Sequence, residues 1–482
     1  MTSSTGHWDE RPVAAALWLQ RMGLAAPGRT TTAPDRRVRL VSGVSCLCLG
    51  LAIGGYFVQR GYSTIMVLVP LVNDAGEQGM LVRYGPLAAL IGAVMLAPFD
   101  GLLRGIDLKH RPWLALLALW TVGLLVVGLM HGNPRYYLLI DLEVMVVLLS
   151  GILLGARSEV WPVLERAYSW VFALGIPVVL LGLFRLDLVD MRFGGKFTAE
   201  AYDSQYLLWP VGFFVMLYGS LPRGRARALV LLAFGMCVLE QVLFQKRAPT
   251  GRLLAFLGFA VVLMVMKPGR GLRRLAALPA LLIGGALAVG VFSVVLGLSL
   301  SDVTDSFALR LTQAQGEQAS SLENARFGFA ARLLDSLAGS ERWFGKGLGG
   351  YLVDSTFGYY VLTGQGTLVR GAASIEIGHT WSILKGGFVF LIVFNLPFAA
   401  ALARGFAWRR LDPLDRAAWA FVATTVAFLF TESLMTHPNQ LYWLLAGAAV
   451  GRLIMARREP PVARDEPRAA YGLRPGAFLA GS

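Results

Sequence analysis

Long stretches of apolar residues alternate along the chain with short polar segments. Stretches near 20 residues can cross the ~30 Å hydrocarbon core of a bilayer as helices. We predict about twelve such spans, at 40–58, 82–99, 112–130, 136–155, 160–184, 205–220, 227–245, 251–267, 275–298, 377–403, 417–435 and 439–456. The apolar run at 62–72 is about half as long, so we interpret it as a re-entrant or outer-surface segment.

Composition supports this assignment, because 56% of the 482 residues are hydrophobic and 15% are charged. Soluble proteins are about half apolar and about a quarter charged. The predicted fold class is therefore an all-α polytopic membrane protein. The net charge of +14 would suggest nucleic acid in a soluble protein. Here the basic residues gather in loops between spans, and we predict no nucleic-acid partner.

The basic loop residues set the predicted orientation, because Lys and Arg favour the cytoplasmic side. With twelve spans they all fall on one side: Arg36, Arg37, Arg39, Arg104, Lys109, Arg111, Arg223, Arg225, Arg227, Lys267, Arg270, Arg273, Arg274, Arg404, Arg409, Arg410, Arg416, Arg452, Arg457 and Arg458. We predict a multi-pass membrane protein with both termini in the cytoplasm.

This topology divides the chain into five parts. A cytoplasmic segment at 1–39 precedes nine spans at 40–298, and a loop at 299–376 on the outer side precedes three more spans at 377–456. The charged, proline-containing tail at 457–482 is predicted to be disordered. The loop at 299–376 is the longest non-hydrophobic segment between spans, and we expect it to cover an active site on the outer face.

Cations on the predicted outer side oppose the topological bias, which indicates an anionic partner. Lys246, Arg247 and Arg252 surround one very short outer loop. Thr250 is placed to cap the next helix, so Arg252 would lie in its first turn. A helix N-terminus with guanidinium groups suits a phosphate or diphosphate. Lipid headgroups are the alternative partner of these side chains.

The large loop contains a predicted helix at 322–338 with an apolar stripe, in which Arg326 lies and from which Arg332 points away. A cation on a buried face needs a partner, which is either Glu323 or a substrate anion. Glu376 and His379 share a helix face at the start of the tenth span. This pair suits a general base or an anion binder, and headgroup contact is the alternative role for His379.

The sequence contains no nucleotide-binding loop, no metalloprotease motif and no paired outer acids at metal spacing, so we predict no cofactor and no metal. Cys46, Cys48 and Cys237 lie in apolar runs and are interpreted as small buried hydrophobes.

Three segments resemble the O-antigen ligase and O-antigen polymerase superfamily of bacterial membrane glycosyltransferases. They are TGRLLAF at 250–256, ARFGFAARLLDSLAGSERWFGKGLGGY at 325–351 and GHTWSILKGGFVFLIVF at 378–394. The family often has Asn or Ser after the His, where this chain has Thr380, and its glycine follows the His later than Gly386 does here.

The resemblance implies a GT-C-like helical fold and transfer of a glycan from undecaprenyl diphosphate to a sugar hydroxyl without a metal. Arg252 and Arg326 would hold the diphosphate, and His379 would contact or activate the acceptor. The leading hypothesis is a polymerase that joins lipid-linked repeat units into O-antigen, capsule or exopolysaccharide. Its partners would be the lipid-linked donor, an acceptor glycan or glycolipid, membrane lipids, a flippase and a chain-length regulator.

Two alternatives stay open. The first is an O-antigen ligase, which moves finished glycan to the lipid A core of lipopolysaccharide, and acceptor chemistry distinguishes it from a polymerase. The second is a secondary transporter, which would show two similar halves and ionisable groups at mid-membrane. The long loop follows the ninth span rather than the sixth, and the outer cations lie at span ends, which disfavours transport.

Overall fold

The protein is described from a computed structural model. The described residues are 44–59, 80–96, 112–157, 160–184, 205–220, 225–244, 247–265, 331–353, 360–372, 378–430 and 440–455. Lys246, Arg326, Glu376, the run at 62–72, the predicted span at 275–298 and both terminal segments lie outside them.

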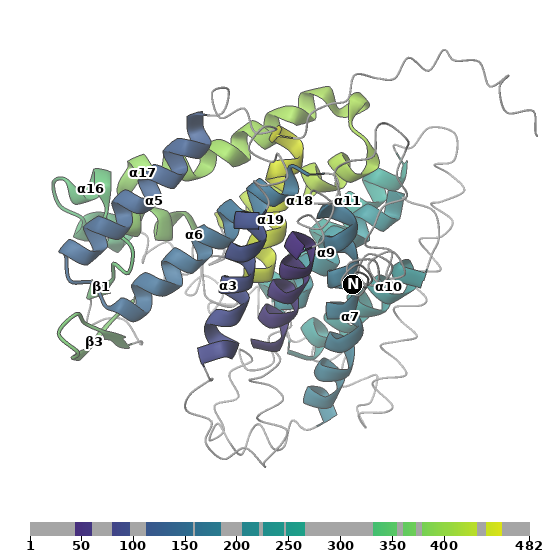
Figure 1. The fold of residues 1–482 in the computed structure, drawn as a ribbon, viewed down its shortest axis with the longest axis horizontal. Helices are drawn as coiled ribbons and strands as arrows, with labels where there is room; N and C mark the ends of the chain where they lie inside the picture. Colours follow the sequence, from purple (N-terminus) through teal and green to yellow (C-terminus); the bar gives the residue numbers. More distant parts are fainter. Residues whose placement is uncertain are drawn as a thin grey trace, which may run out of the picture.

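The described part is mostly helical. Besides a helix at Val44–Gln59, its helices are α3 (Met80–Leu96), α5 (Pro112–Met130), α6 (Arg135–Gly155), α7 (Val160–Phe184), α9 (Gln205–Ser220), α10 (Arg225–Phe244), α11 (Arg247–Val265), a helical segment at 331–336, α16 (Glu341–Phe344), α17 (Gly378–Ala403), the 3-10 helix η3 (Arg404–Arg410), α18 (Pro413–Leu429) and α19 (Gln440–Met455). Figure 1 shows α5, α6 and α17 on one side of the molecule and α7 and α10 on the other.

Every predicted span that falls on described residues coincides with a helix. Of these helices, α5, α6 and the helix that starts at Gly378 are long and apolar enough to cross a membrane, and six others are shorter apolar helices. Helix α18 begins at Pro413, four residues before the predicted start of the eleventh span at 417. Asp412 caps the helix by accepting a hydrogen bond from the Asp415 amide, and Pro413 occupies the first turn.

Close packing of α6 against α19 forms the centre of the helical core. Each of these helices carries two glycines four residues apart, Gly151 and Gly155 on α6 and Gly447 and Gly451 on α19. All four face the other helix. A methyl group on any of these glycines would meet backbone atoms of the other helix. Small residues at this spacing let helix backbones approach closely, as in membrane helix pairs.

Large aromatic side chains fill the core between α9, α18 and α19. Trp209 and Phe213 of α9 pack edge-to-face on Phe421 of α18, with ring centroids 5.9 and 5.4 Å apart. Tyr442 of α19 lies 4.4 Å from Trp209 by ring centroids. All of these side chains are buried, which fixes the three helices relative to one another.

A small sheet between α16 and α17 corrects the all-α prediction. Strands β1 (Leu352–Val353), β2 (Tyr360–Leu362) and β3 (Leu368–Ala372) are antiparallel in the order β1-β3-β2. β2 and β3 form a hairpin closed by a hydrogen bond from the Thr363 amide to the Thr367 carbonyl. Strands this short leave no periodic pattern long enough to recognise in the sequence.

The glycine-rich segment 345–350, here called the docked loop, follows α16 and bonds to α5 and to Asn133. The Leu348 amide donates to the Leu124 carbonyl of α5 at 2.9 Å, and Asn133 donates to the Lys346 and Leu348 carbonyls at 2.9 and 2.8 Å. Leu348 belongs to the main hydrophobic core. This irregular backbone is stable inside the molecule because α5 and Asn133 satisfy its hydrogen bonds.

Candidate functional site

Arg252 is buried among aromatic rings near the start of α11. The residue is only 4% exposed. The guanidinium carbon lies 5.3 Å from the ring centroid of Trp209 and 6.0 Å from the ring centroid of Phe428. Phe428 is near the end of α18. Aromatic faces attract a guanidinium and hold it in a fixed plane. The structure therefore gives Arg252 a defined orientation.

The start of α11 differs from the expectation for Thr250. The helix begins at Arg247, so Thr250 lies within it and Arg252 lies in its second turn rather than its first. Pro249 is compatible with this start, because proline is tolerated in the first turn of a helix. The side chain of Arg247 lies outside the described residues. Free amides at a Thr250 cap therefore cannot be the anion site next to Arg252.

His379 is the second residue of α17 and is 9% exposed. Its ring packs edge-to-face on Phe430, the residue that ends α18, with centroids 4.2 Å apart. Neither ring nitrogen has a hydrogen-bond partner among the residues that the structure describes. A buried imidazole with both nitrogens available can bind a polar ligand or exchange a proton with it.

Arg252 and His379 thus both contact the last turn of α18, through Phe428 and Phe430. These two aromatic residues are two positions apart, so they point to nearly opposite sides of the helix. Arg252 and His379 approach the end of α18 from different sides. A ligand that touches both would lie over the end of that helix.

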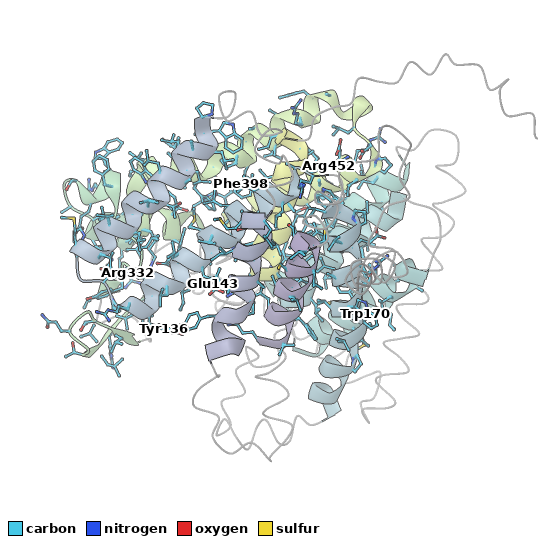
Figure 2. The ribbon with its side chains drawn as sticks, viewed as in Figure 1. Tyr136, Glu143, Trp170, Arg332, Phe398 and Arg452 are labelled. Carbon is cyan, nitrogen blue, oxygen red and sulfur yellow. The ribbon has the colours of Figure 1, made fainter. Side chains whose placement is uncertain are left out.

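Arg332 lies elsewhere. It is half-buried in the helical segment at 331–336, whose neighbour Leu333 packs with Ile383 and Leu384 of α17. Figure 2 shows Arg332 on the side of the molecule that carries the sheet, whereas α11 lies on the other side in the same view. The structure does not place Arg332 at the end of α18 with Arg252.

A buried ion pair between Asp141 of α6 and Lys385 of α17 was not predicted from the sequence. The Lys385 ammonium lies 2.8 Å from Asp141 Oδ2. Trp381 donates to Asp141 Oδ1 at 3.0 Å, and the Gly349 amide donates to Oδ2 at 2.7 Å. Lys385 also donates to the Gly350 carbonyl at 2.6 Å. Opposite charges inside two predicted spans were the available signal, because ionisable residues there need partners.

Among the described residues there is no group of three or more His, Cys, Asp or Glu side chains placed to hold a metal ion. The metal-independent reaction stays a prediction. Neither the models of known protein families nor the curated proteins with which the sequence was compared give a match.

Proposed function

We propose that this protein is a glycosyltransferase of the periplasmic membrane face that polymerises repeat units carried on undecaprenyl diphosphate. The observation that carries the proposal is that Arg252 and His379 both pack against aromatic residues at the end of α18, Arg252 against Phe428 and His379 against Phe430. Both residues belong to the segments that resemble the O-antigen superfamily. They come from distant parts of the sequence, and the fold brings both to the same helix end.

The buried arginine supports an anionic substrate. Taking a guanidinium out of water is costly, and ionisable residues inside membrane helices usually mark a substrate pathway. In this protein Trp209 and Phe428 hold the charge in place. A planar guanidinium can donate two hydrogen bonds to phosphate oxygens, and it would stabilise the charge that builds up on a departing diphosphate.

The position of His379 supports a role at the acceptor. Its ring is fixed by Phe430 and both nitrogens are available among described groups. One nitrogen would accept the proton of the attacking sugar hydroxyl while the oxygen bonds to the anomeric carbon and the diphosphate leaves. Twelve spans, the GT-C-like architecture, the inner-membrane location and the roles of Lys246, Arg247, Arg326 and Glu376 belong to the same proposal.

Deletion of the gene in its source bacterium tests the reaction. A polymerase is expected to leave single repeat units on the surface glycan and no ladder of longer chains. A ligase is expected to leave full-length polymer on its lipid carrier and no polymer on lipid A. An unchanged glycan profile would contradict both.

Site assignment needs variants that still accumulate in the membrane. Arg252→Gln and His379→Gln should each reproduce the deletion. Arg452→Gln is a matched control, because Arg452 lies at the other end of the helices and pairs with Asp412 and Asp415 at 2.8 Å. Normal glycan with both site variants would remove the assignment.

The Asp141–Lys385 pair is an observation that favours transport, since transporters place ionisable groups within their spans. However, Trp381, Gly349 and Gly350 already bond to this pair. The pair is hydrogen-bonded by other groups of the protein, which is typical of a structural ion pair rather than a transported-ion site.

A further inference from the structure

The first eight residues of α17, 378–385, form a separate helical segment. The backbone leaves helical geometry at Gly386 (φ −137°) and Gly387 (φ 65°), so the segment is not a rigid extension of the helix that follows. A side chain on Gly387 would collide with the backbone of Trp343 and Phe344. Only glycine combines this left-handed conformation with so close a contact.

The docked loop completes the end of this segment. A break in a helix leaves carbonyl groups without their usual partners. Here the Lys346 amide donates to the Leu384 carbonyl at 2.9 Å, and the Gly347 amide donates to the Lys385 carbonyl at 2.8 Å. The orientation of segment 378–385 is therefore set by its contacts with other parts of the protein.

Asp141 binds one face of the segment at two points. Trp381 and Lys385 are four residues apart, so they lie on the same side of the helix, and Asp141 receives a hydrogen bond from each. His379 is two positions before Trp381, which places it about 200° around the helix axis. Holding Trp381 and Lys385 against α6 turns His379 toward the end of α18, where it meets Phe430.

We infer that Asp141 is a positioning residue for His379. Through Trp381 and Lys385 it fixes the rotation of segment 378–385, and through Gly349 it fixes the docked loop that caps the same segment. The assignment of a function to this position rests on the proposed role of His379. The geometric part of the inference stands without it.

Cysteine cross-linking measures the geometry directly. Cys46, Cys48 and Cys237 are first replaced by alanine, and cysteines are then introduced as His379→Cys and Phe430→Cys in the full-length protein in membranes. A short bifunctional maleimide should join the two positions efficiently. Trp381→Phe and Asp141→Asn should each lower the yield about tenfold, the effect expected when a hydrogen bond to a charged group is lost.

Two further variants separate positioning from general loss of structure. Asp141→Glu keeps the charge and should restore most of the cross-linking yield. Ser45→Ala removes a different buried interhelical hydrogen bond, the one to the Ala93 carbonyl at 2.7 Å, and should leave the yield unchanged. Equal yields in the parent, Trp381→Phe and Asp141→Asn proteins would overturn the inference, as would a parent protein that does not cross-link.

The glycan profile of the same substitutions in the His379-containing protein distinguishes the two proposals. Reduced cross-linking together with shortened glycan supports both. Reduced cross-linking with a normal glycan ladder keeps the positioning role of Asp141 and contradicts the proposed function of His379. Unchanged cross-linking contradicts the positioning role whatever the glycan profile is.

Discussion

Lys385 and Asp141 form an ion pair 2.8 Å long whose side chains are 0% and 6% exposed. Desolvation of two charges is compensated only when geometry is good and the remaining polar atoms are also bonded. Here the Trp381 indole, the Gly349 amide and the Gly350 carbonyl meet that condition. The pair connects α6, α17 and the docked loop, three parts that are distant in sequence.

Removing one member of this pair should strongly destabilise the protein. Asp141→Asn leaves a buried ammonium without its counter-ion and should cost about 3–5 kcal/mol. Thermal unfolding of detergent-purified protein measures this loss. The double variant Asp141→Asn/Lys385→Met should recover part of it, and a loss equal to the sum of the single variants would contradict the expected coupling.

The ion pair of Arg452 with Asp412 offers a comparison in a more exposed setting. Their side chains are 17% and 47% exposed, and the Arg452–Asp412 distance is again 2.8 Å. Asp412→Ser keeps a capping side chain at the start of α18 and should cost only about 0–1 kcal/mol. Equal destabilisation by Asp412→Ser and Asp141→Asn would show that burial does not decide the strength of these pairs.

Substitution of Gly347 should release the docked loop. Gly347 has φ 77°, and a methyl group there would meet the backbone of Gly128 in α5. Gly366 has nearly the same φ, 79°, with open space around it. Gly366→Ala should cost about 1–2 kcal/mol from backbone strain alone, while Gly347→Ala should cost more and expose 339–350 to limited proteolysis. Equal cleavage rates would contradict the docking of residues 345–350 against α5.

Alanine should have opposite effects at two helical glycines. Gly258 of α11 has open space around it, so Gly258→Ala should stabilise the helix by about 0.5–1 kcal/mol or leave it unchanged. Gly151 faces the Leu444 carbonyl of α19, and Gly151→Ala should force α6 and α19 apart and reduce the amount of folded protein. Size-exclusion chromatography of the detergent-solubilised variants distinguishes these outcomes.

The identity of the cation at position 252 should matter for the proposed reaction. Arg252→Lys keeps the charge but loses the planar group that stacks on Trp209, and it should retain only part of the activity. Arg252→Gln should lower the polymerisation rate by on the order of 10²-fold, as loss of a preorganised donor does in other enzymes. The length distribution of the glycan ladder reports both. Equal ladders for Lys and Gln would contradict a role for charge.

Helix positions were predictable because a run of some 20 apolar residues is a strong signal that local sequence carries alone. The bounds of α5, α7 and α9 coincide with the predicted spans at 112–130, 160–184 and 205–220. That these helices cross a membrane, and that twelve do so, stays a prediction. Arg252 and His379 were selected for a second reason, since they stand at the ends of apolar runs, and their function stays a prediction.

Contacts between distant segments were not predictable in the same way. The docking of residues 345–350 depends on Asn133, Leu124 and Asp141, none of which has a local pattern that indicates a partner some 200 residues away. The three strands are too short to show alternation. Asp141 and Lys385 could have been selected as charges within apolar runs, but only the structure pairs them.

The bond between Asp141 and Lys385 also has a consequence for biosynthesis. The ribosome makes α6 long before it makes either the docked loop or α17. In the proposed topology, a carboxylate inside the bilayer must therefore await both its counter-ion and the amide of Gly349. A chain truncated before residue 345 should leave α6 poorly inserted and open to quality-control proteases, so that the first half of the protein matures only when the second half arrives.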